Sequence, residues 1–294
     1  MLPLLFSAVL FPTAQAGEPS YPTQVTQTSL GEVAYWDVNV GTPSGPPVVL
    51  VHGLPTSKEL WVNVIPELHD KRVIVVDLLE FGETRASDRS TLRHPDRARG
   101  VHEVIEALDI ETIDLVAHDL GSSVAVDFMD LFGESVRKLV LASSPVYPDF
   151  DEPGVVELVR KPVVGFVLTN LFPRRMYRMT LRIGLENDRT ISHEQVSAFM
   201  HAYRCPPGKR RLLDNLAWGT PEDMFAAYPE ILRGISQPTL LLQGEEDPWI
   251  PVEHAQRLDA DIPNSELVMI PGGGHFLPLD TPVAVGKAVS SFLE

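Results

Sequence analysis

The stretch that most constrains how this chain can fold is a short apolar run that turns directly into a helical pattern. Residues 113–117 are apolar except for Asp114, as in a buried strand, and from Gly121 apolar residues recur at helical spacing up to Leu131. A strand that turns sharply into a helix presents its corner residue at the carboxyl end of the sheet. The corner residue is Asp119, whose carboxylate can attack carbon and form an ester or, as the plainer alternative, cap the helix.

Strand-like apolar runs alternate with helical patterns along most of the chain. The runs occupy residues 48–51, 72–77, 113–117, 136–142, 239–243 and 266–270, and a two-stranded ribbon is expected at 23–29 and 32–38. Helical spacing is found at residues 59–68, 92–108, 251–258 and 282–293. The alternation predicts an α/β fold with a mostly parallel, doubly wound sheet covered on both faces. In such sheets, ligands bind at the carboxyl ends of the strands.

The strand pattern is interrupted once, in the middle of the chain. Residues 145–236 contain no clear buried strand but have helical patterns, and we predict that they form an inserted helical cap over the sheet rim. The sheet domain is then made of residues 17–144 and 237–294. Residues 1–16 are mostly apolar and end in Ala14-Gln15-Ala16, which resembles a secretory signal peptide. The protein is therefore expected to be secreted or periplasmic if this leader is cleaved, and cytoplasmic otherwise.

Two further polar residues stand just past apolar runs and complete a nucleophilic site. Asp247 follows the run at 239–243 and His275 follows the run at 266–270, so the chain order is nucleophile, acid, histidine. In this arrangement Asp119 attacks an electrophilic carbon, His275 activates the water that hydrolyses the ester, and Asp247 orients the imidazole. Taken alone, Asp247 is equally consistent with a turn residue and His275 with a loop histidine.

Two motifs carry a resemblance to a known family. The segments Ala117-His118-Asp119-Leu120-Gly121 and His52-Gly53-Leu54-Pro55, together with Asp247 and His275, resemble the Asp-nucleophile branch of the α/β-hydrolase superfamily. This branch holds epoxide hydrolases and haloalkane dehalogenases, and the resemblance covers most of the chain, most weakly in the predicted cap. It implies that the backbone amides of Leu54 and Leu120 form an oxyanion hole, with a cis bond before Pro55, and that no cofactor or metal ion takes part.

The two activities of this branch differ in the donors that assist the leaving group. In the dehalogenases, side-chain N–H groups hold the halide at the positions of Leu54 and Leu120, where leucine has no side-chain donor. This weakens the dehalogenase interpretation without excluding it, because a donor from the cap such as Trp218 could substitute.

Epoxide hydrolases use tyrosine hydroxyl groups of the cap to protonate the opening oxygen. Tyr203, within Ala202-Tyr203-Arg204, most resembles such a residue, and Tyr147 and Tyr177 are further candidates for this acid. We therefore predict an epoxide hydrolase-like enzyme, with a haloalkane dehalogenase-like enzyme as the alternative. A carboxylic ester hydrolase and a non-catalytic binding protein with a hydrolase-like fold are less favoured.

Composition limits the partners. The 294 residues carry a net charge of −16, which argues against nucleic acid or an anionic membrane surface as the partner and favours a neutral substrate. No stretch beyond the leader is long and apolar enough to span a bilayer. Cys205 is the only cysteine, so no disulfide or thiolate cluster can form within the chain. We expect a small neutral organic substrate and water as partners, no nucleic acid, no integral membrane association, and a monomer or homodimer.

Overall fold

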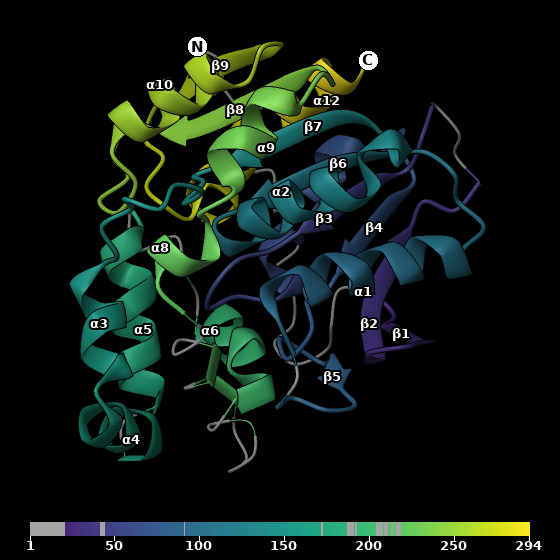
Figure 1. Ribbon diagram of the computed structural model, residues 1–294. Coiled ribbons are helices and arrows are strands. Elements are labelled where there is room, and N and C mark those ends of the chain that lie inside the picture. The colour runs from purple at the N-terminus through teal and green to yellow at the C-terminus, as the bar shows by residue number, and fades with distance from the viewer. Residues whose placement is uncertain are drawn as a thin grey trace, which may run out of the picture.

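The computed structural model describes residues 21–294 except 42–44, 91, 172, 187–190, 192, 204–207, 209–210, 213 and 216–218. The predicted leader at residues 1–16 and the candidate donor Trp218 therefore lie outside the described residues. Figure 1 shows a central sheet with helices on both of its faces and a group of helices at one end. The predicted α/β fold with a mostly parallel sheet is confirmed.

The described sheet has antiparallel pairings at one side, all of them involving β2, and continues in parallel. In spatial order its strands are β1 (Gln24–Thr28), β2 (Gly31–Val38), β4 (Val73–Val76), β3 (Val48–Val51), β6 (Ile113–His118), β7 (Val136–Ala142), β8 (Thr239–Gly244) and β9 (Ser265–Ile270). The short strand β5 (Arg85–Ala86) pairs with β2. The predicted ribbon is the antiparallel pair β1–β2, and every pairing from β4 to β9 is parallel.

The register of the central strands brings the segments that follow them to one rim. Val51, the last residue of β3, is paired with Val76 on one side and with Ala117 on the other. The end of β6 is in turn level with the end of β7, because His118 is paired with Ala142. Parallel strands that end at the same level place the residues that follow them side by side, where α/β folds bind ligands.

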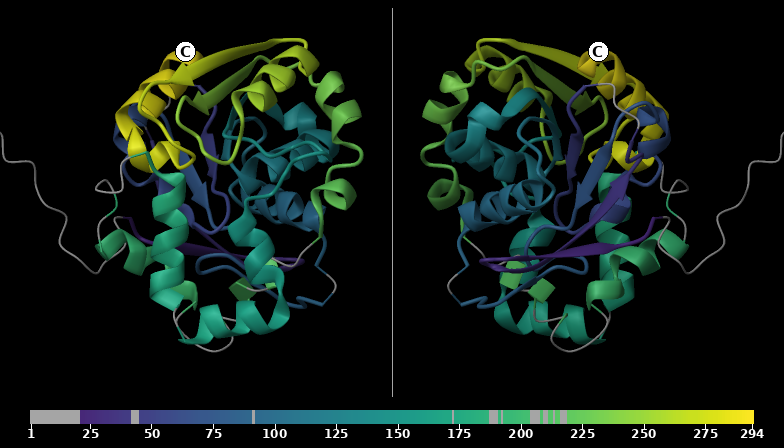
Figure 2. Two further views of the ribbon diagram at one scale, coloured as in Figure 1. Left: turned by 90° about the vertical axis from the view of Figure 1, so that its left-hand side faces the viewer. Right: turned by 90° about the vertical axis from the view of Figure 1, so that its right-hand side faces the viewer.

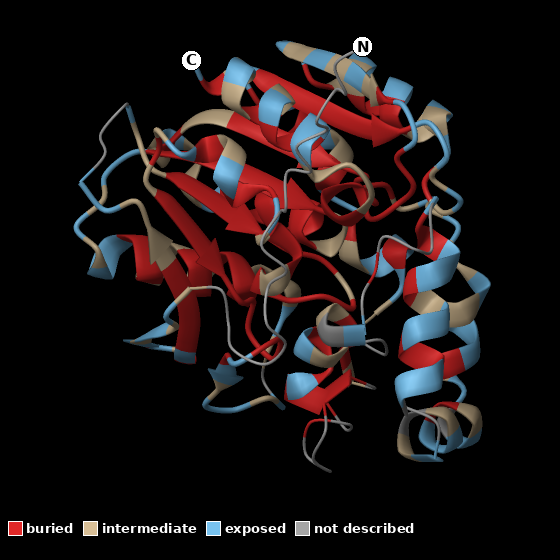
Figure 3. Ribbon diagram, turned by 180° about the vertical axis from the view of Figure 1, so that it is seen from behind, coloured by how far each residue is buried: buried red, intermediate tan, exposed pale blue. Residues whose placement is uncertain are grey.

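Alternating side chains of the central strands pack into two cores, one on each face of the sheet. In β3, Val48 and Leu50 belong to one core, while Val49 and Val51 belong to the other. The first core is covered by α12 (Pro282–Leu293) and two short 3₁₀ helices, Lys58–Trp61 and Ile65–Leu68. The second is covered by α1 (His94–Ala107), α2 (Leu120–Phe132) and α10 (Val252–Asp261). Figure 3 shows the strands as the most buried layer of the molecule.

One predicted helix is wrong. Residues 59–68 have helical spacing, but the structure divides them into two 3₁₀ helices separated at Val62–Val64. Pro66 lies at the start of the second helix, and proline has no N–H to continue an α-helical hydrogen-bond ladder. The apolar spacing still serves burial, since Leu60, Trp61 and Ile65 all pack into the first core.

We call residues 143–238, between β7 and β8, the insertion. Every regular element in its described part is helical: α3 (Gly154–Arg160), α4 (Pro162–Leu171), α5 (Pro173–Gly184), α6 (His193–Phe199), a 3₁₀ turn (His201–Tyr203), α8 (Pro221–Met224) and α9 (Tyr228–Gly234). Helices α3 to α5 stand together at one end of the molecule (Figures 1 and 2). Helix α9 instead packs on the sheet domain, because Tyr228 and Leu232 share a core with Phe128 of α2. Among the described residues, no helix has the length and apolarity needed to cross a membrane.

Candidate active site

Asp119 occupies a sharp turn between β6 and α2. Its backbone has φ 53° and ψ −125°, a conformation that residues with a side chain rarely adopt and that is typical of functional sites. The turn requires a close approach to the end of β3, since a Cβ atom on Gly121 would lie 2.5 Å from the carbonyl oxygen of His52. The Asp119 side chain does not cap α2, because a capping side chain accepts from the amide of the second or third helical residue and Asp119 makes no such bond.

The carboxylate of Asp119 is held between a backbone amide and an imidazole. Its Oδ1 accepts a hydrogen bond of 2.6 Å from the N–H of Leu54, and the N–H of Leu120 also hydrogen-bonds to the carboxylate. Its Oδ2 lies 3.3 Å from Nε2 of His275. The two amides named from the sequence therefore face the nucleophile candidate itself. The bond between Leu54 and Pro55 is cis.

His275 is in turn held by Asp247, across the end of the sheet. Nδ1 of His275 lies 3.1 Å from Oδ2 of Asp247. The other carboxylate oxygen, Oδ1, accepts hydrogen bonds from the backbone N–H groups of Trp249 at 2.9 Å and Ile250 at 3.0 Å. The structure thus brings Asp119, His275 and Asp247 together in a line, although they are separated by up to 156 residues in the sequence.

Electrostatics favour a charged imidazole between two carboxylates. Burial alone would lower the pKa of His275, but the charges of and hydrogen bonds to Asp247 and Asp119 outweigh burial and raise it to about 10. Burial would raise the pKa of Asp247, yet His275 and the two backbone amides lower it to about 2. The pKa of Asp119 is also lowered, chiefly by His275 against the effect of burial. At neutral pH both carboxylates are ionised and the imidazole carries a proton on each nitrogen.

Two further histidines support this arrangement from beneath. Nε2 of His118 donates a 2.8 Å hydrogen bond to the backbone carbonyl of His275, and burial together with the charge of His275 lowers the pKa of His118 to about 4. His52 accepts at Nε2 from the N–H of Leu78 at 3.2 Å, and its Nδ1 is 2.9 Å from the carbonyl oxygen of Gly53. Burial lowers the pKa of His52 as well. Both histidines are therefore neutral and hydrogen-bond to the backbone of the site, His52 through both ring nitrogens and His118 through Nε2 alone, while Nδ1 of His118 is buried without a hydrogen-bond partner among the described residues.

A cavity of about 110 Å³ opens above Asp119 and His275. Its floor is formed by residues that follow the strands, including Leu54, Leu120 and Trp249. Its wall is formed by the inner sides of α3 and α5. Most of the lining is apolar, and the two charged residues from the insertion, Glu152 and Arg160, form an ion pair with each other. A cavity of this size and character suits a small, uncharged molecule.

The model of the α/β hydrolase fold family matches residues 46–282, which is most of the chain. The protein belongs to the α/β hydrolase fold family. It is an enzyme of this family, with relatives that are named hydrolases and haloalkane dehalogenases.

Three similar proteins illustrate the range of this family. A haloalkane dehalogenase of Mesorhizobium japonicum is 27% identical over 85% of this chain and 85% of the relative. A 2-hydroxy-6-oxo-6-(2'-aminophenyl)hexa-2,4-dienoic acid hydrolase of Metapseudomonas resinovorans is 28% identical over 96% of this chain and 94% of the relative. The crystal structure of haloalkane dehalogenase DbeA from Bradyrhizobium elkani superposes with a TM-score of 0.79 over 92% of this chain and 98% of that chain, at 21% identity. That likeness concerns the fold alone.

Within this α/β hydrolase, the tyrosines named from the sequence have three different environments. Tyr177 of α5 lines the cavity, and its hydroxyl donates to the carbonyl oxygen of Pro55. Tyr203 is buried beside Tyr177, with ring centroids 6.4 Å apart, but it does not line the cavity. Tyr147 lies away from the cavity, where its hydroxyl donates a 2.8 Å hydrogen bond to Asp261 of α10. Neither Tyr147 nor Tyr203 lines the cavity, so neither side chain is positioned to contact a ligand above Asp119.

Two residues at this site of the α/β hydrolase were not singled out from the sequence. Trp249 lines the cavity, and its ring centroid is 4.6 Å from that of His275. Gln243, at the end of β8, is buried and its Nε2 lies 3.3 Å from Oδ2 of Asp247 and 3.0 Å from the carbonyl oxygen of Ile250. Trp249 could have been found from the sequence, because it lies two residues after the predicted acid Asp247. Nothing in the sequence distinguishes Gln243 from other polar residues in strands.

Proposed function

We propose that this protein is a hydrolase in which Asp119 attacks an electrophilic carbon and forms an alkyl-enzyme ester. The observation that carries the proposal is the Asp119 carboxylate, which sits at the strand–helix corner without capping the helix and faces the apolar cavity. A carboxylate is a suitable nucleophile when it is ionised and positioned against carbon. The lowered pKa of Asp119 keeps it ionised at neutral pH.

The second half of the proposed reaction releases the product by hydrolysis of the ester. His275 takes a proton from a water molecule that attacks the ester carbonyl carbon, and Asp247 holds the imidazole in place. Esterification turns the Asp119 carboxylate into a neutral group, so it removes one of the two negative charges that raise the pKa of His275. The N–H groups of Leu54 and Leu120 then stabilise the oxyanion that forms on the ester.

Epoxides are the substrate class that we place first. When an epoxide opens, the departing oxygen needs a proton, and Tyr177 is the tyrosine among the described residues that line the cavity. Its hydroxyl donates to the carbonyl oxygen of Pro55 in the free enzyme, so the proposal requires this hydroxyl to turn from that carbonyl to the epoxide oxygen when substrate binds. Burial raises the pKa of Tyr177 well above its usual value, which keeps the phenol protonated and able to donate. Leu54 and Leu120, in turn, supply no side-chain donor for a halide.

Displacement of a halide is the second candidate. Trp249 brings an indole ring to the cavity next to His275, and an indole N–H is a hydrogen-bond donor without acceptor character, which suits an anion. The haloalkane dehalogenases of Mesorhizobium japonicum and Bradyrhizobium diazoefficiens, at 27% and 26% identity, support this candidate by likeness.

Trapping the ester tests the mechanism and separates the two substrate classes. We expect His275→Gln to form the ester but not to hydrolyse it, so incubation with a substrate should leave a stable adduct on Asp119. Mass spectrometry of the intact chain and of its peptides measures the adduct. An epoxide adds its whole mass, whereas a haloalkane adds its mass less that of the hydrogen halide.

The matched control for the trapping experiment is the double variant Asp119→Asn with His275→Gln, which has no carboxylate to alkylate. It should carry no adduct under the same conditions. If the wild-type enzyme turns over a substrate that leaves no adduct on His275→Gln, Asp119 is not the nucleophile for that substrate.

A further inference from the structure

Helices α4 and α5 expose an unusual set of apolar side chains. We call residues 161–183, which include α4 and all of α5 except its last residue, Gly184, the α4–α5 hairpin. On α4, Val163, Phe166 and Leu171 are 78%, 62% and 67% exposed, and their spacing places them along one side of the helix together with Val167. On α5, Met179 and Ile183 are also exposed. A contiguous exposed apolar face of this kind marks an interaction site in a folded protein.

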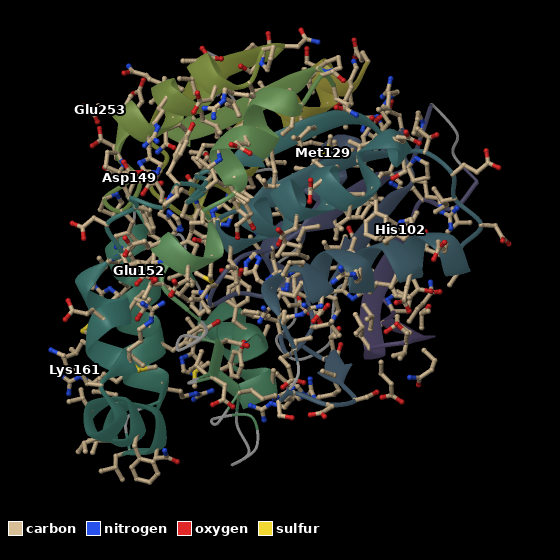
Figure 4. The ribbon with its side chains drawn as sticks, in the orientation of Figure 1. His102, Met129, Asp149, Glu152, Lys161 and Glu253 are labelled. Carbon is tan, nitrogen blue, oxygen red and sulfur yellow. The ribbon has the colours of Figure 1, made fainter. Side chains whose placement is uncertain are left out.

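The same hairpin is basic, whereas the rest of the chain is strongly acidic. Residues 161–183 contain five basic side chains and no Asp or Glu: Lys161, Arg174, Arg175, Arg178 and Arg182. The remaining chain has 19 Lys and Arg against 40 Asp and Glu. All five basic side chains are exposed. Figure 4 shows Lys161 at the outer edge of the molecule, pointing away from the sheet domain.

The helical register keeps the basic and apolar side chains on the outer face of α5. Arg174, Arg178 and Arg182 follow at intervals of four, and so do Arg175, Met179 and Ile183, which gives two adjacent rows on one face. The opposite face is buried and includes Met176, Tyr177 and Leu181. Met176, Tyr177 and Thr180 line the cavity above Asp119, so the outer rows and the cavity wall lie on opposite faces of one helix.

We propose that the α4–α5 hairpin docks this enzyme on an anionic lipid surface, with the apolar face of α4 inserted between headgroups and the arginines of α5 on lipid phosphates. A helix with one apolar and one cationic face lies in the plane of a membrane interface in this way. Helix α4 has ten residues, too few to span a bilayer, so it would rest on the surface. The cavity wall would then stand next to a membrane from which a lipophilic substrate can enter.

The net charge of the molecule does not oppose this docking at the ionic strength of a cell. Charges separated by more than a Debye length of about 10 Å are largely screened, so the membrane experiences mainly the charges nearest to it. Figures 1 and 2 show α4 at the far end of the insertion, away from the sheet and from α12. The hairpin can therefore act as a local cationic contact on an acidic protein.

Vesicle sedimentation of the full chain tests this proposal. We expect the protein to bind vesicles that contain phosphatidylglycerol, to bind pure phosphatidylcholine vesicles much less, and to be released by added salt. Arg175→Glu with Arg178→Glu should weaken binding more than about 20-fold, since each basic side chain near an anionic surface contributes several-fold. Val163→Asp with Phe166→Asp should weaken it as strongly, because the apolar contact is removed.

Matched controls lie outside the hairpin, on α9 and α12. Lys287→Glu with Arg233→Glu makes the same change in charge at exposed positions, and Val283→Asp places a charge on an exposed apolar position of α12. These variants should bind vesicles as the wild type does. Circular dichroism and hydrolysis of a water-soluble substrate should be the same in all variants, because none of the changed side chains lines the cavity.

Two results would overturn the docking proposal. One is a folded wild-type protein that stays in solution with anionic vesicles at low salt. The other is a molar mass by light scattering of two chains that falls to one chain in Val163→Asp with Phe166→Asp, because a second copy would then cover this face. Neither result bears on the ester at Asp119, which the trapping experiment tests separately.

Discussion

His275 lies between two carboxylates, and its protonation connects the two steps of the proposed reaction. The pKa of this histidine is raised to about 10 by Asp247 and Asp119, so the free enzyme holds a proton on the group that later has to act as a base. The same ion pair orients the Asp119 carboxylate for attack. Once Asp119 is an ester, one negative charge is gone and the imidazole loses its proton more readily.

This coupling predicts different pH profiles for the two steps. Alkylation needs ionised Asp119, whose pKa is lowered, so its rate should stay level from roughly pH 5 to 8. Hydrolysis needs neutral His275, so its rate should rise by about tenfold per pH unit until the pKa of His275 in the ester form is passed. Quenched-flow kinetics with mass detection of the ester measures both rates. A hydrolysis rate that falls as the pH rises would contradict the assigned base.

A site residue could be predicted from the sequence when a strand end determines its position, and could not when helix packing determines the direction of its side chain. Asp119 and Asp247 each follow a buried strand and His275 follows the edge strand β9, and the ends of these parallel strands bring all three residues to one rim. The direction of Tyr147 or Tyr203 depends on how the helices of the insertion pack, and no periodicity encodes that. Tyr203 had the most family-like context, yet Tyr177 is the tyrosine that lines the cavity.

At the scale of elements, the site depends on the contact between the β6–α2 corner and the end of β3. Gly121→Ala would put its Cβ atom 2.5 Å from the carbonyl oxygen of His52 and 2.7 Å from that of Val51. Backbone atoms cannot turn aside as a side chain can, so we expect a loss of about 1–3 kcal/mol in the free energy of unfolding. Urea denaturation measures it.

Gly133→Ala is the matched control for the corner. Gly133 has a helical φ of −56°, and the nearest atom to a new Cβ is Cε of Met129 at 3.4 Å. This variant should change the free energy of unfolding by about 0.5 kcal/mol or less. Equal stability of the two variants would mean that the corner is not held against β3 as described.

The elements themselves were predictable where burial sets the pattern. Strands covered on both faces are rich in apolar residues, and β3, β4, β6, β7 and β8 were all found in this way. The segment at residues 59–68 has apolar spacing that fits a helix, but Pro66 interrupts the backbone hydrogen bonds, and spacing alone does not show this. Helix α9 lies within residues 145–236, which were assigned to the cap because they lack a strand pattern, whereas its buried face packs on α2.

At the scale of the whole molecule, charge is segregated rather than uniform. The net charge of −16 argues against an anionic partner for the molecule as a whole, yet residues 161–183 are basic and apolar and stand apart from the acidic remainder. The basic character of residues 161–183 can be predicted from the sequence when the charge is counted segment by segment. The sequence could not show that α5 carries the cavity wall on one face and the rows of basic side chains on the other, because that depends on how the helix packs.

The most direct test of the account follows the oxygen atom that the product receives. In a single turnover with enzyme in excess in ¹⁸O-water, the new carbon–oxygen bond comes from the Asp119 carboxylate, and water labels the carboxyl group when it attacks the ester. We predict an unlabelled first product and ¹⁸O in the peptide that contains Asp119, measured by mass spectrometry. Label in the first product, with none in that peptide, would mean direct attack by water and would contradict the nucleophilic role of Asp119.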